Sequence, residues 1–211
     1  MVIKMRVKGN IIMSIKDRRT LYHLTKLDNL YTILEHGLVS RKILINKGLY
    51  FEDVADSEII DFRKRMDLDR YVPFHFYPHT PFDWVVQNNN PDSDFIYICI
   101  SKDIAEHNKF NIIPTHPLSM DSFRLYEYQE GMEEINWELM DKRDYFDLEC
   151  KSVCMAECVT NLCIPYNCFQ SITVKNIDVK KIVEERVKDY KQKNNIEKNI
   201  YIDIRNNWFN K

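Results

Sequence analysis

Glycine is scarce in this chain, with only 4 residues in a sequence of 211. Nucleotide-binding loops of the P-loop and Rossmann types need closely spaced glycines, because only glycine lets the backbone come so near a phosphate. No such cluster is present, which argues against both kinds of phosphate site. The GxSxG motif of a nucleophile elbow is missing as well, so the sequence gives no support to a serine hydrolase.

Long apolar runs and a strong net charge are also absent. No stretch approaches the roughly 20 apolar residues of a membrane-spanning helix, and the first residues lack the cleavage site of a secretory signal. We therefore expect a cytoplasmic protein without a membrane segment. The formal net charge of −2 gives no general attraction to nucleic acid. Any contact with DNA or RNA must then rely on local basic clusters.

The six cysteines follow no pattern that is typical of metal sites. They are Cys99, Cys150, Cys154, Cys158, Cys163 and Cys168. Their spacings match neither the CxxC pairs of zinc sites nor ferredoxin runs, and reduced thiols are expected in the cytoplasm. A strand over 152–160 would place Cys154 and Cys158 on the face opposite Glu157, as small core residues. We predict no bound metal and keep a metal or redox protein as an alternative.

The length of 211 residues fits one compact domain with a sizeable core. Met13 opens a run that looks like a natural start, so we take residues 1–12 as an N-terminal extension and 13–211 as a single domain. Residue patterning predicts strands at 21–25, 71–76, 95–100, 152–160, 169–174 and 200–204, and helices at 57–66, 103–108 and 178–193. Short strands separated by helices indicate an α+β fold.

Capping and turn residues predict where some elements begin and end. Thr25 and Asp28 have the spacing of a capping box, and Gly37 suits the end of the helix that would follow. Residues 38–55 are expected to form a loop with a short strand. Prolines and an asparagine run predict a further loop over 78–90.

Two polar side chains stand out within apolar strands. Glu157 lies in an Ala-Glu-Cys-Val run, where a carboxylate is costly unless it is paired or functional. The alternative is an edge-strand residue that faces water. His23 and Thr25 share one strand face, where both could hydrogen-bond a sugar or an amide, although a lone histidine is more often a satisfied core residue. We expect the two segments to form the walls of one cleft for a dinucleotide.

Basic and aromatic residues offer candidate contacts to phosphates and bases. Arg63, Lys64 and Arg65 form either a solvated helix face or a phosphate contact, because arginine matches the geometry of phosphate. The aromatic residues of the next segment form either core or a platform on which nicotinamide or a base stacks. They are Tyr71, Phe74, Phe76 and Tyr77.

Six segments, in order along the chain, resemble one known family. They read LYHLTKLDNLYTILEHGLVS (21–40), DSEIIDFRKR (56–65), YVPFHFYPHTPF (71–82), EEINWELM (133–140), MAECV (155–159) and IYIDIRNNWF (200–209). Together they resemble the DarT family, toxins that ADP-ribosylate DNA. The chain departs from the family pattern before Glu157, where Lys151 is the only basic residue, and at His79, where the family often has arginine.

The resemblance implies an ADP-ribosyltransferase-like fold, with two small packed β-sheets around an NAD cleft and flanking helices. It implies transfer of ADP-ribose from NAD to a thymine or guanine base of single-stranded DNA. NAD is then a substrate, and no metal is needed. A cognate antitoxin that reverses the modification is the implied partner. The alternatives are a transferase of the same fold that acts on RNA or protein, and a non-catalytic interaction module.

The resemblance also assigns residues to roles. It implies that Glu157 and Arg63 are catalytic. Contacts to NAD are expected from His23, Leu24, Thr25, Asn29, Arg63, Tyr71 and Phe74. Contacts to DNA are expected from Tyr77, His79 and Lys151.

Overall fold

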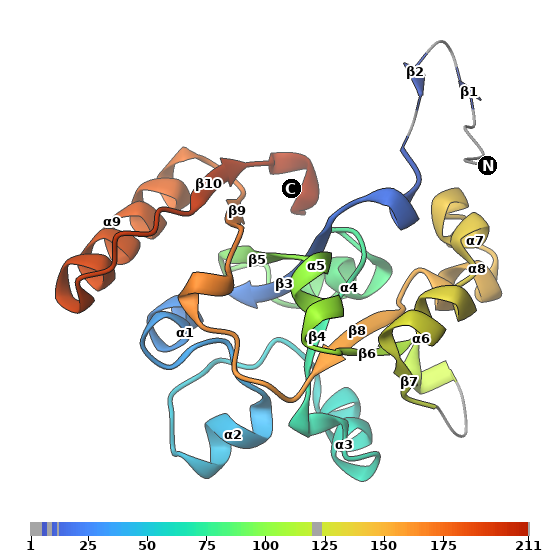
Figure 1. Ribbon diagram of the computed structural model, residues 1–211, viewed down its shortest axis with the longest axis horizontal. Helices are drawn as coiled ribbons and strands as arrows, with labels where there is room; N and C mark the ends of the chain where they lie inside the picture. The colour runs from blue at the N-terminus through green and yellow to red at the C-terminus, as the bar shows by residue number, and fades with distance from the viewer. Residues whose placement is uncertain (1–5, 8–9, 12, 120–123, 211) are drawn as a thin grey trace.

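The computed structural model describes residues 6–7, 10–11, 13–119 and 124–210 of the chain (Figure 1). Of the expected N-terminal extension, only two short paired strands, β1 (Arg6–Val7) and β2 (Asn10–Ile11), are described. The rest of residues 1–12, and Lys211, lie outside the described residues, so the boundary of the extension stays a prediction.

The first main sheet has four strands in the order β10-β9-β5-β3. They are β3 (Thr20–Lys26), β5 (Phe95–Ser101), β9 (Ser171–Val174) and β10 (Tyr201–Ile204). Only the β10–β9 pair is parallel. The apolar run of β5 is buried on both faces, because alternate side chains enter different cores. Ile96, Ile98 and Ile100 join the largest cluster, whereas Phe95 and Tyr97 join a second one.

The second sheet has the order β4-β8-β6-β7. Its strands are β4 (Val72–Phe74), β6 (Asn111–Ile113), β7 (Tyr126–Glu127) and β8 (Glu157–Thr160). β8 pairs with β4 on one side and with β6 on the other, so it is a central strand. Backbone hydrogen bonds between Tyr22 and His75 join this sheet to β3 of the first. Two small sheets therefore meet along β3 and the end of β4, as the fold prediction requires.

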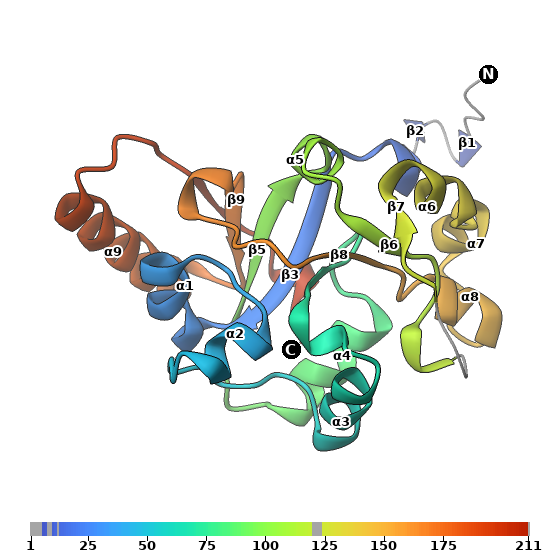
Figure 2. The ribbon, with the colours of Figure 1, turned by 60° about the horizontal axis from the view of Figure 1, so that its bottom comes forward.

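Helices flank both sheets (Figures 1 and 2). They are α1 (Leu30–His36), α2 (Arg41–Asn46), α3 (Ser57–Arg65), α4 (Pro81–Asn89), α5 (Lys102–His107), α6 (Tyr128–Glu134), α7 (Trp137–Lys142), α8 (Leu148–Val153) and α9 (Ile177–Asn194). α9 buries Val179, Val183 and Val187 along one face. It lies at the opposite end of the molecule from α7 and α8 in both views. Within the described ranges, no helix is long and apolar enough to cross a membrane.

Three local predictions are wrong. The loop expected over 78–90 contains α4, because Thr80 and Asp83 form a capping box and Pro81 occupies the first turn, where its missing N–H costs nothing. Residues 38–55 contain the helix α2 rather than a strand. Thr25 does not cap a helix: it stays in β3, and α1 follows a 3₁₀ turn and ends at Gly37, as expected.

The strand expected over 152–160 is half wrong. Its first part completes α8, and only Glu157–Thr160 is β8. Cys154 therefore follows a helix instead of sharing a strand face with Cys158. Both thiols are nevertheless buried in the main core, as the packing argument expected.

Candidate active site

A cleft opens between the two sheets, beneath the chain segment that joins α2 to α3. Its walls come from β3, α1, α2, α3, the start of β4 and β8. His23 lines one side and Glu157 another, so the structure brings together the two segments expected to form its walls. Leu24, Thr25, Asn29, Arg63 and Tyr71 also line it.

Glu157 and Arg63 form a buried ion pair. Arg63 Nη1 donates to both carboxylate oxygens of Glu157, at 2.8 and 3.0 Å. The exposed fraction of the side chain is only 14% for Arg63 and 8% for Glu157. Glu157 is thus neither an edge residue nor a residue that faces water. A buried charge pair of this kind is weak evidence for stability, because desolvation offsets the attraction, but it is common where charge serves a function.

Helix α3 aims Arg63 at the cleft. The Asp56 side chain caps the helix by accepting a hydrogen bond from the backbone N–H of Ile59. Arg63 lies in the last turn and points inward, whereas Lys64 and Arg65 are exposed. The interpretation of the basic run as a solvated helix face therefore holds for Lys64 and Arg65 but not for Arg63.

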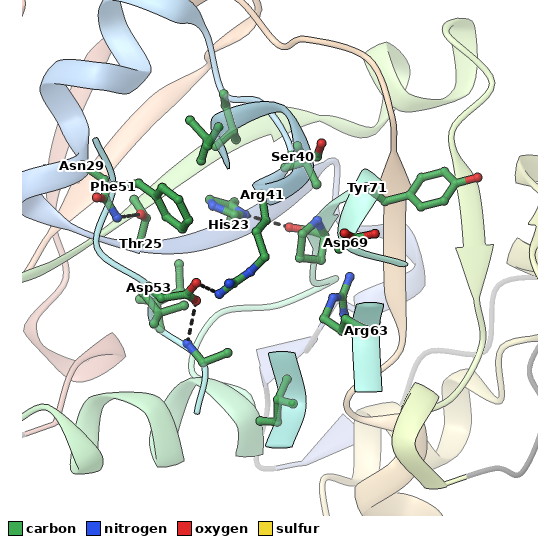
Figure 3. Close-up of a pocket in the computed structure, with 18 of the residues that line it drawn as sticks. His23, Thr25, Asn29, Ser40, Arg41, Phe51, Asp53, Arg63, Asp69 and Tyr71 are labelled. Carbon is green, nitrogen blue, oxygen red and sulfur yellow. Dashed lines mark hydrogen bonds and ion pairs between the residues drawn. The ribbon is translucent and has the colours of Figure 1, made fainter. Parts of the chain in front are cut away.

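His23 presents a hydrogen-bond acceptor to the cleft. Its Nδ1 lies 2.8 Å from the carbonyl oxygen of Pro73, and only a protonated nitrogen can donate to a carbonyl. Burial lowers the pKa of His23 to about 4, so the ring is neutral at pH 7. With the proton on Nδ1, Nε2 has a free lone pair. It suits a ligand hydroxyl or amide N–H (Figure 3).

Asn29 has a structural task besides its place in the cleft wall. Its Nδ2 donates to Thr25 Oγ1 at 3.0 Å and to the carbonyl oxygen of Glu52 at 2.8 Å. Its Oδ1 accepts from the N–H of Glu52 at 2.6 Å. The amide therefore ties residues 51–55, which line the cleft, to β3 and α1.

Two of the aromatic residues expected to contact NAD are placed differently. Phe74 is completely buried, does not line the cleft, and packs behind His23 with a ring separation of 5.7 Å. Tyr71 lines the cleft, but its ring points away from Arg41 and His23 (Figure 3). Phe76 and Tyr77 are buried, as the core interpretation held. The β-strand alternation at 72–76 turns the rings of Phe74 and Phe76 to the core rather than to a ligand.

Sequence reasoning missed Arg41 and Asp53, which form an ion pair inside the cleft (Figure 3). The Arg41 guanidinium also lies over the Phe51 ring, 5.6 Å from its centroid. No local signal could identify these residues. They lie in a polar stretch read as a loop, and only the fold brings them opposite one another.

Several buried polar atoms of the cleft have no hydrogen-bond partner among the described residues. They include Ser40 Oγ, Arg63 Nη2 and Asp83 Oδ1, and all three residues line the cleft. Such atoms are costly unless a ligand or water satisfies them. The cleft is thus built for a polar ligand that both donates and accepts hydrogen bonds.

His116 is a third cleft residue that the sequence did not point to. It lines the cleft together with Glu157. Burial lowers the pKa of His116, against the opposing influence of Glu157, so the neutral ring is favoured at pH 7. A neutral imidazole near a carboxylate can accept a proton.

The three residues expected to contact DNA lie outside this cleft. Tyr77, His79 and Lys151 line a separate groove on the other side of residues 75–83. His75, Phe82 and Asp83 of that segment line the cleft. No group of three or more possible metal ligands occurs in the part of the chain that the structure describes.

Comparisons with known proteins identify the fold and the family. No curated protein matches the chain. Among solved structures, DarT of Thermus sp. 2.9 in complex with ADP-ribosylated single-stranded DNA is similar at a TM-score of 0.75 and 21% identity, over 91% of this chain and 96% of that one. Its complex with carba-NAD+ gives 0.72 and 19%, over 92% and 99%. DarTG of Thermosipho africanus in complex with ADP-ribose gives 0.71 and 20%, over 91% of this chain and 51% of that one.

These structures confirm the predicted ADP-ribosyltransferase fold. The family model described as "DarT: ssDNA thymidine ADP-ribosyltransferase" matches residues 22–210. The match extends over nearly the whole described chain and includes every residue of the Arg63–Glu157 cleft. The chain therefore belongs to the DarT family, an NAD-dependent ADP-ribosyltransferase family that modifies single-stranded DNA.

Proposed function

We propose that this chain transfers ADP-ribose from NAD to N3 of a thymine in single-stranded DNA, and that Glu157 and Arg63 carry the reaction. The observation behind the proposal is the buried Arg63–Glu157 pair in the wall of the cleft. The family description, which specifies thymidine, favours thymine over guanine. Residues 13–211 act as one catalytic domain.

The chemistry begins with cleavage of the bond between the nicotinamide nitrogen and the ribose C1′. Nicotinamide leaves with the bonding electron pair, and positive charge develops at C1′. The Glu157 carboxylate stabilises this charge. Because the charge develops only near the transition state, the stabilisation lowers the barrier and accelerates the step. Arg63 holds that carboxylate through Nη1 and keeps Nη2 for a phosphate or a base carbonyl.

The base then bonds to C1′ through N3, and its proton must leave. Glu157 and the neutral ring of His116 both line the cleft and can accept this proton. In a duplex, N3 is engaged in base pairing and cannot reach the cleft. The acceptor must therefore be single-stranded or extruded.

The remaining cleft residues bind and position NAD. His23 accepts a hydrogen bond from the carboxamide or a ribose hydroxyl through Nε2. Leu24, Thr25 and Tyr71 contribute to the wall, and Asn29 fixes the segment that covers the ligand. The neighbouring groove, which Tyr77, His79 and Lys151 line, takes the DNA strand, with Lys151 as one of its cations.

The cellular setting follows from the substrate. We propose that the protein acts in the cytoplasm, where bacterial DNA is accessible, and that it is a toxin with a cognate antitoxin that removes the modification. The naming of the Thermosipho relative as DarTG supports a two-component system.

Labelled NAD tests the proposal. The protein is incubated with single-stranded oligonucleotides that contain thymine as the only modifiable base, with matched ones that contain guanine instead, and with RNA. We expect label on the thymine oligonucleotide and a product mass that corresponds to one added ADP-ribose. Label only on guanine, RNA or protein contradicts the proposed acceptor. Failure to bind NAD in calorimetry contradicts the enzyme and favours an interaction module.

A further inference from the structure

The segment 75–83 forms one wall of the cleft and ends in the first turn of α4. His75 and Phe82 of this segment line the cleft. His75 Nδ1 lies 3.2 Å from the carbonyl oxygen of Ala156, the residue before Glu157. The centroid of the Phe82 ring lies 5.8 Å from that of the His75 ring. A shift of this wall would therefore displace two rings that line the cleft close to the catalytic carboxylate.

The middle of the wall has a backbone conformation that needs support. His79 has a φ of 60°, in the left-handed region that residues other than glycine rarely adopt. Such a conformation persists only where the surrounding structure holds it. The His75 end is already held, because backbone hydrogen bonds join His75 to Tyr22 of β3. The turn at His79 and the helix α4 that follows it must be fixed by other contacts.

Tyr97 of β5 provides the first of these contacts. Its hydroxyl oxygen accepts a hydrogen bond from the backbone N–H of His79 at 2.9 Å, and the hydroxyl donates to Asp83 Oδ2 at 3.1 Å. Burial, followed by the Asp83 carboxylate, raises the pKa of Tyr97, so the hydroxyl keeps its proton. The side chain is completely buried and does not line the cleft. Tyr97 therefore joins the turn to the start of α4 from behind the wall.

Asn210 provides the second contact. Its Nδ2 donates to the carbonyl oxygen of Trp84 in α4 at 3.0 Å, which fixes the orientation of the amide. Its Oδ1 then faces Nε2 of His79 at 3.0 Å, so this ring nitrogen carries the proton and donates it. The backbone N–H of Asn210 donates to Gln87 Oε1 at 3.0 Å. One residue is thus bonded both to the turn and to two positions of α4.

The two aromatic residues before Asn210 hold it in place. The Phe209 ring lies 5.4 Å from the Tyr97 ring, and the Trp208 ring lies 6.0 Å from it, between centroids. Phe209 belongs to the second core cluster, and Trp208 packs against that cluster. We call Tyr97 and residues 208–210 the aromatic clasp. It ties the wall of the cleft to a core on the other side of the first sheet.

We propose that the aromatic clasp positions the wall of the cleft for ADP-ribose transfer, with Tyr97 and Asn210 as positioning residues. Neither residue lines the cleft, so both act through the wall that they hold. The inference rests on the proposed function, because the rate of that reaction reports the position of the wall. It adds to the proposed function a dependence on two residues that make no contact with substrate.

The experiment measures kcat on a thymine oligonucleotide, Kd for NAD and the melting temperature of each variant. Tyr97→Phe removes the hydroxyl and keeps the packed ring. Asn210→Ala removes both side-chain hydrogen bonds. Val187→Ala is the matched control, because it opens a cavity in the buried face of α9, a helix that contributes no residue to the cleft. All rates are measured at a temperature at which every variant is folded.

The clasp variants should lose rate more than they lose affinity for NAD. Tyr97→Phe and Asn210→Ala should each lower kcat about tenfold, because a displacement of about 1 Å at a reacting centre can cost up to about 10² in rate. Kd for NAD should rise only a few-fold, since the walls from β3, α1, α2 and α3 are unchanged. Val187→Ala should lower the melting temperature at least as much and keep the wild-type kcat.

Failure of the clasp and failure of the proposed function give different results. If both clasp variants melt at a lower temperature but keep the wild-type kcat, the clasp only stabilises the fold and the proposal is overturned. If the wild type labels only RNA or protein, the proposed acceptor is wrong, and the same comparison of kcat on that acceptor decides whether the clasp positions the wall.

Discussion

The cleft and the groove share one wall, residues 75–83, but they hold their charges in opposite ways. In the cleft, Arg41 faces Asp53 and Arg63 faces Glu157, so each arginine is neutralised before any ligand arrives. In the groove, the cations Arg18, Arg143 and Lys151 have no carboxylate partner among the described residues. The ion pairs fix the positions of the side chains around the reacting atoms. The unpaired cations can instead adjust to the phosphates of a flexible strand.

This contrast makes the two regions respond differently to mutation. A cleft residue is coupled to a buried partner, so its removal should disturb both stability and catalysis. A groove residue is exposed and unpaired, so its removal should affect only binding of the acceptor.

Arg63→Met should destabilise the fold strongly. It leaves the Glu157 carboxylate buried without its counter-ion, and breaking a buried pair costs about 3–5 kcal/mol. The free energy of unfolding, measured with urea at pH 7, checks this. Arg124→Met is the control, because Arg124 pairs with Glu130 on the surface. Equal losses in the two variants would show that the cleft pair is not buried in solution.

Acid should destabilise the cleft through His23. Burial holds its folded-state pKa at about 4, below the unfolded value of 6.5, so the unfolded chain binds the extra proton first. Stability from this group is therefore complete above pH 6.5 and is lost as the pH falls towards 4, by about 3 kcal/mol in total.

His23→Asn provides the comparison for this effect, since asparagine does not titrate. Urea unfolding of both proteins at pH 7, 5.5 and 4 measures the difference directly. The wild type should lose more stability than the variant over this range. Parallel curves would mean that His23 is solvated and is protonated normally.

Asn29→Ala should have an intermediate effect. The change leaves the backbone N–H and carbonyl of Glu52 without partners, at a cost of about 1–3 kcal/mol. It also frees residues 51–55, so Kd for NAD should rise in calorimetry. Asn194→Ala removes an exposed hydrogen bond on α9 and should change neither quantity. If Kd for NAD is unchanged in Asn29→Ala, residues 51–55 do not contribute to binding of NAD.

Arg143→Met should have the smallest effect on stability. Its side chain is exposed and unpaired, so the free energy of unfolding should stay within about 0.5 kcal/mol of the wild type. Thermal unfolding measures it. If Arg143→Met lowers the free energy of unfolding as much as Arg63→Met does, the cleft and the groove do not differ in how they hold their charges.

The parts of this design that could be predicted are those with a local signal. The β5 run FIYICI is buried on both faces, and its composition alone indicates a strand. Glu157 is conspicuous because a carboxylate in an apolar strand must be explained. Arg63 could be chosen from three neighbouring basic residues only through the family resemblance, since all three look alike as a helix face.

The other parts depend on tertiary contacts. Pro81 reads as a loop residue until Thr80 and Asp83 are seen to cap a helix around it. Phe74 was expected to contact NAD, but the pleat of β4 turns it into the core. Arg41 and Asp53 lie twelve residues apart in one stretch predicted as a loop, and they become a pair only when the chain folds. The residues next to each of them in the sequence give no indication of this ion pair.

The most direct test of the account is the rate of ADP-ribose transfer by Glu157→Gln. The variant keeps the shape of the side chain but removes the charge, so kcat on a thymine oligonucleotide should fall by about 10²–10³, as when another preorganised electrostatic group is lost. Kd for NAD should stay within a few-fold of the wild type, and Glu130→Gln should react normally. Transfer by Glu157→Gln at the wild-type rate would contradict the central claim that the buried carboxylate carries the reaction.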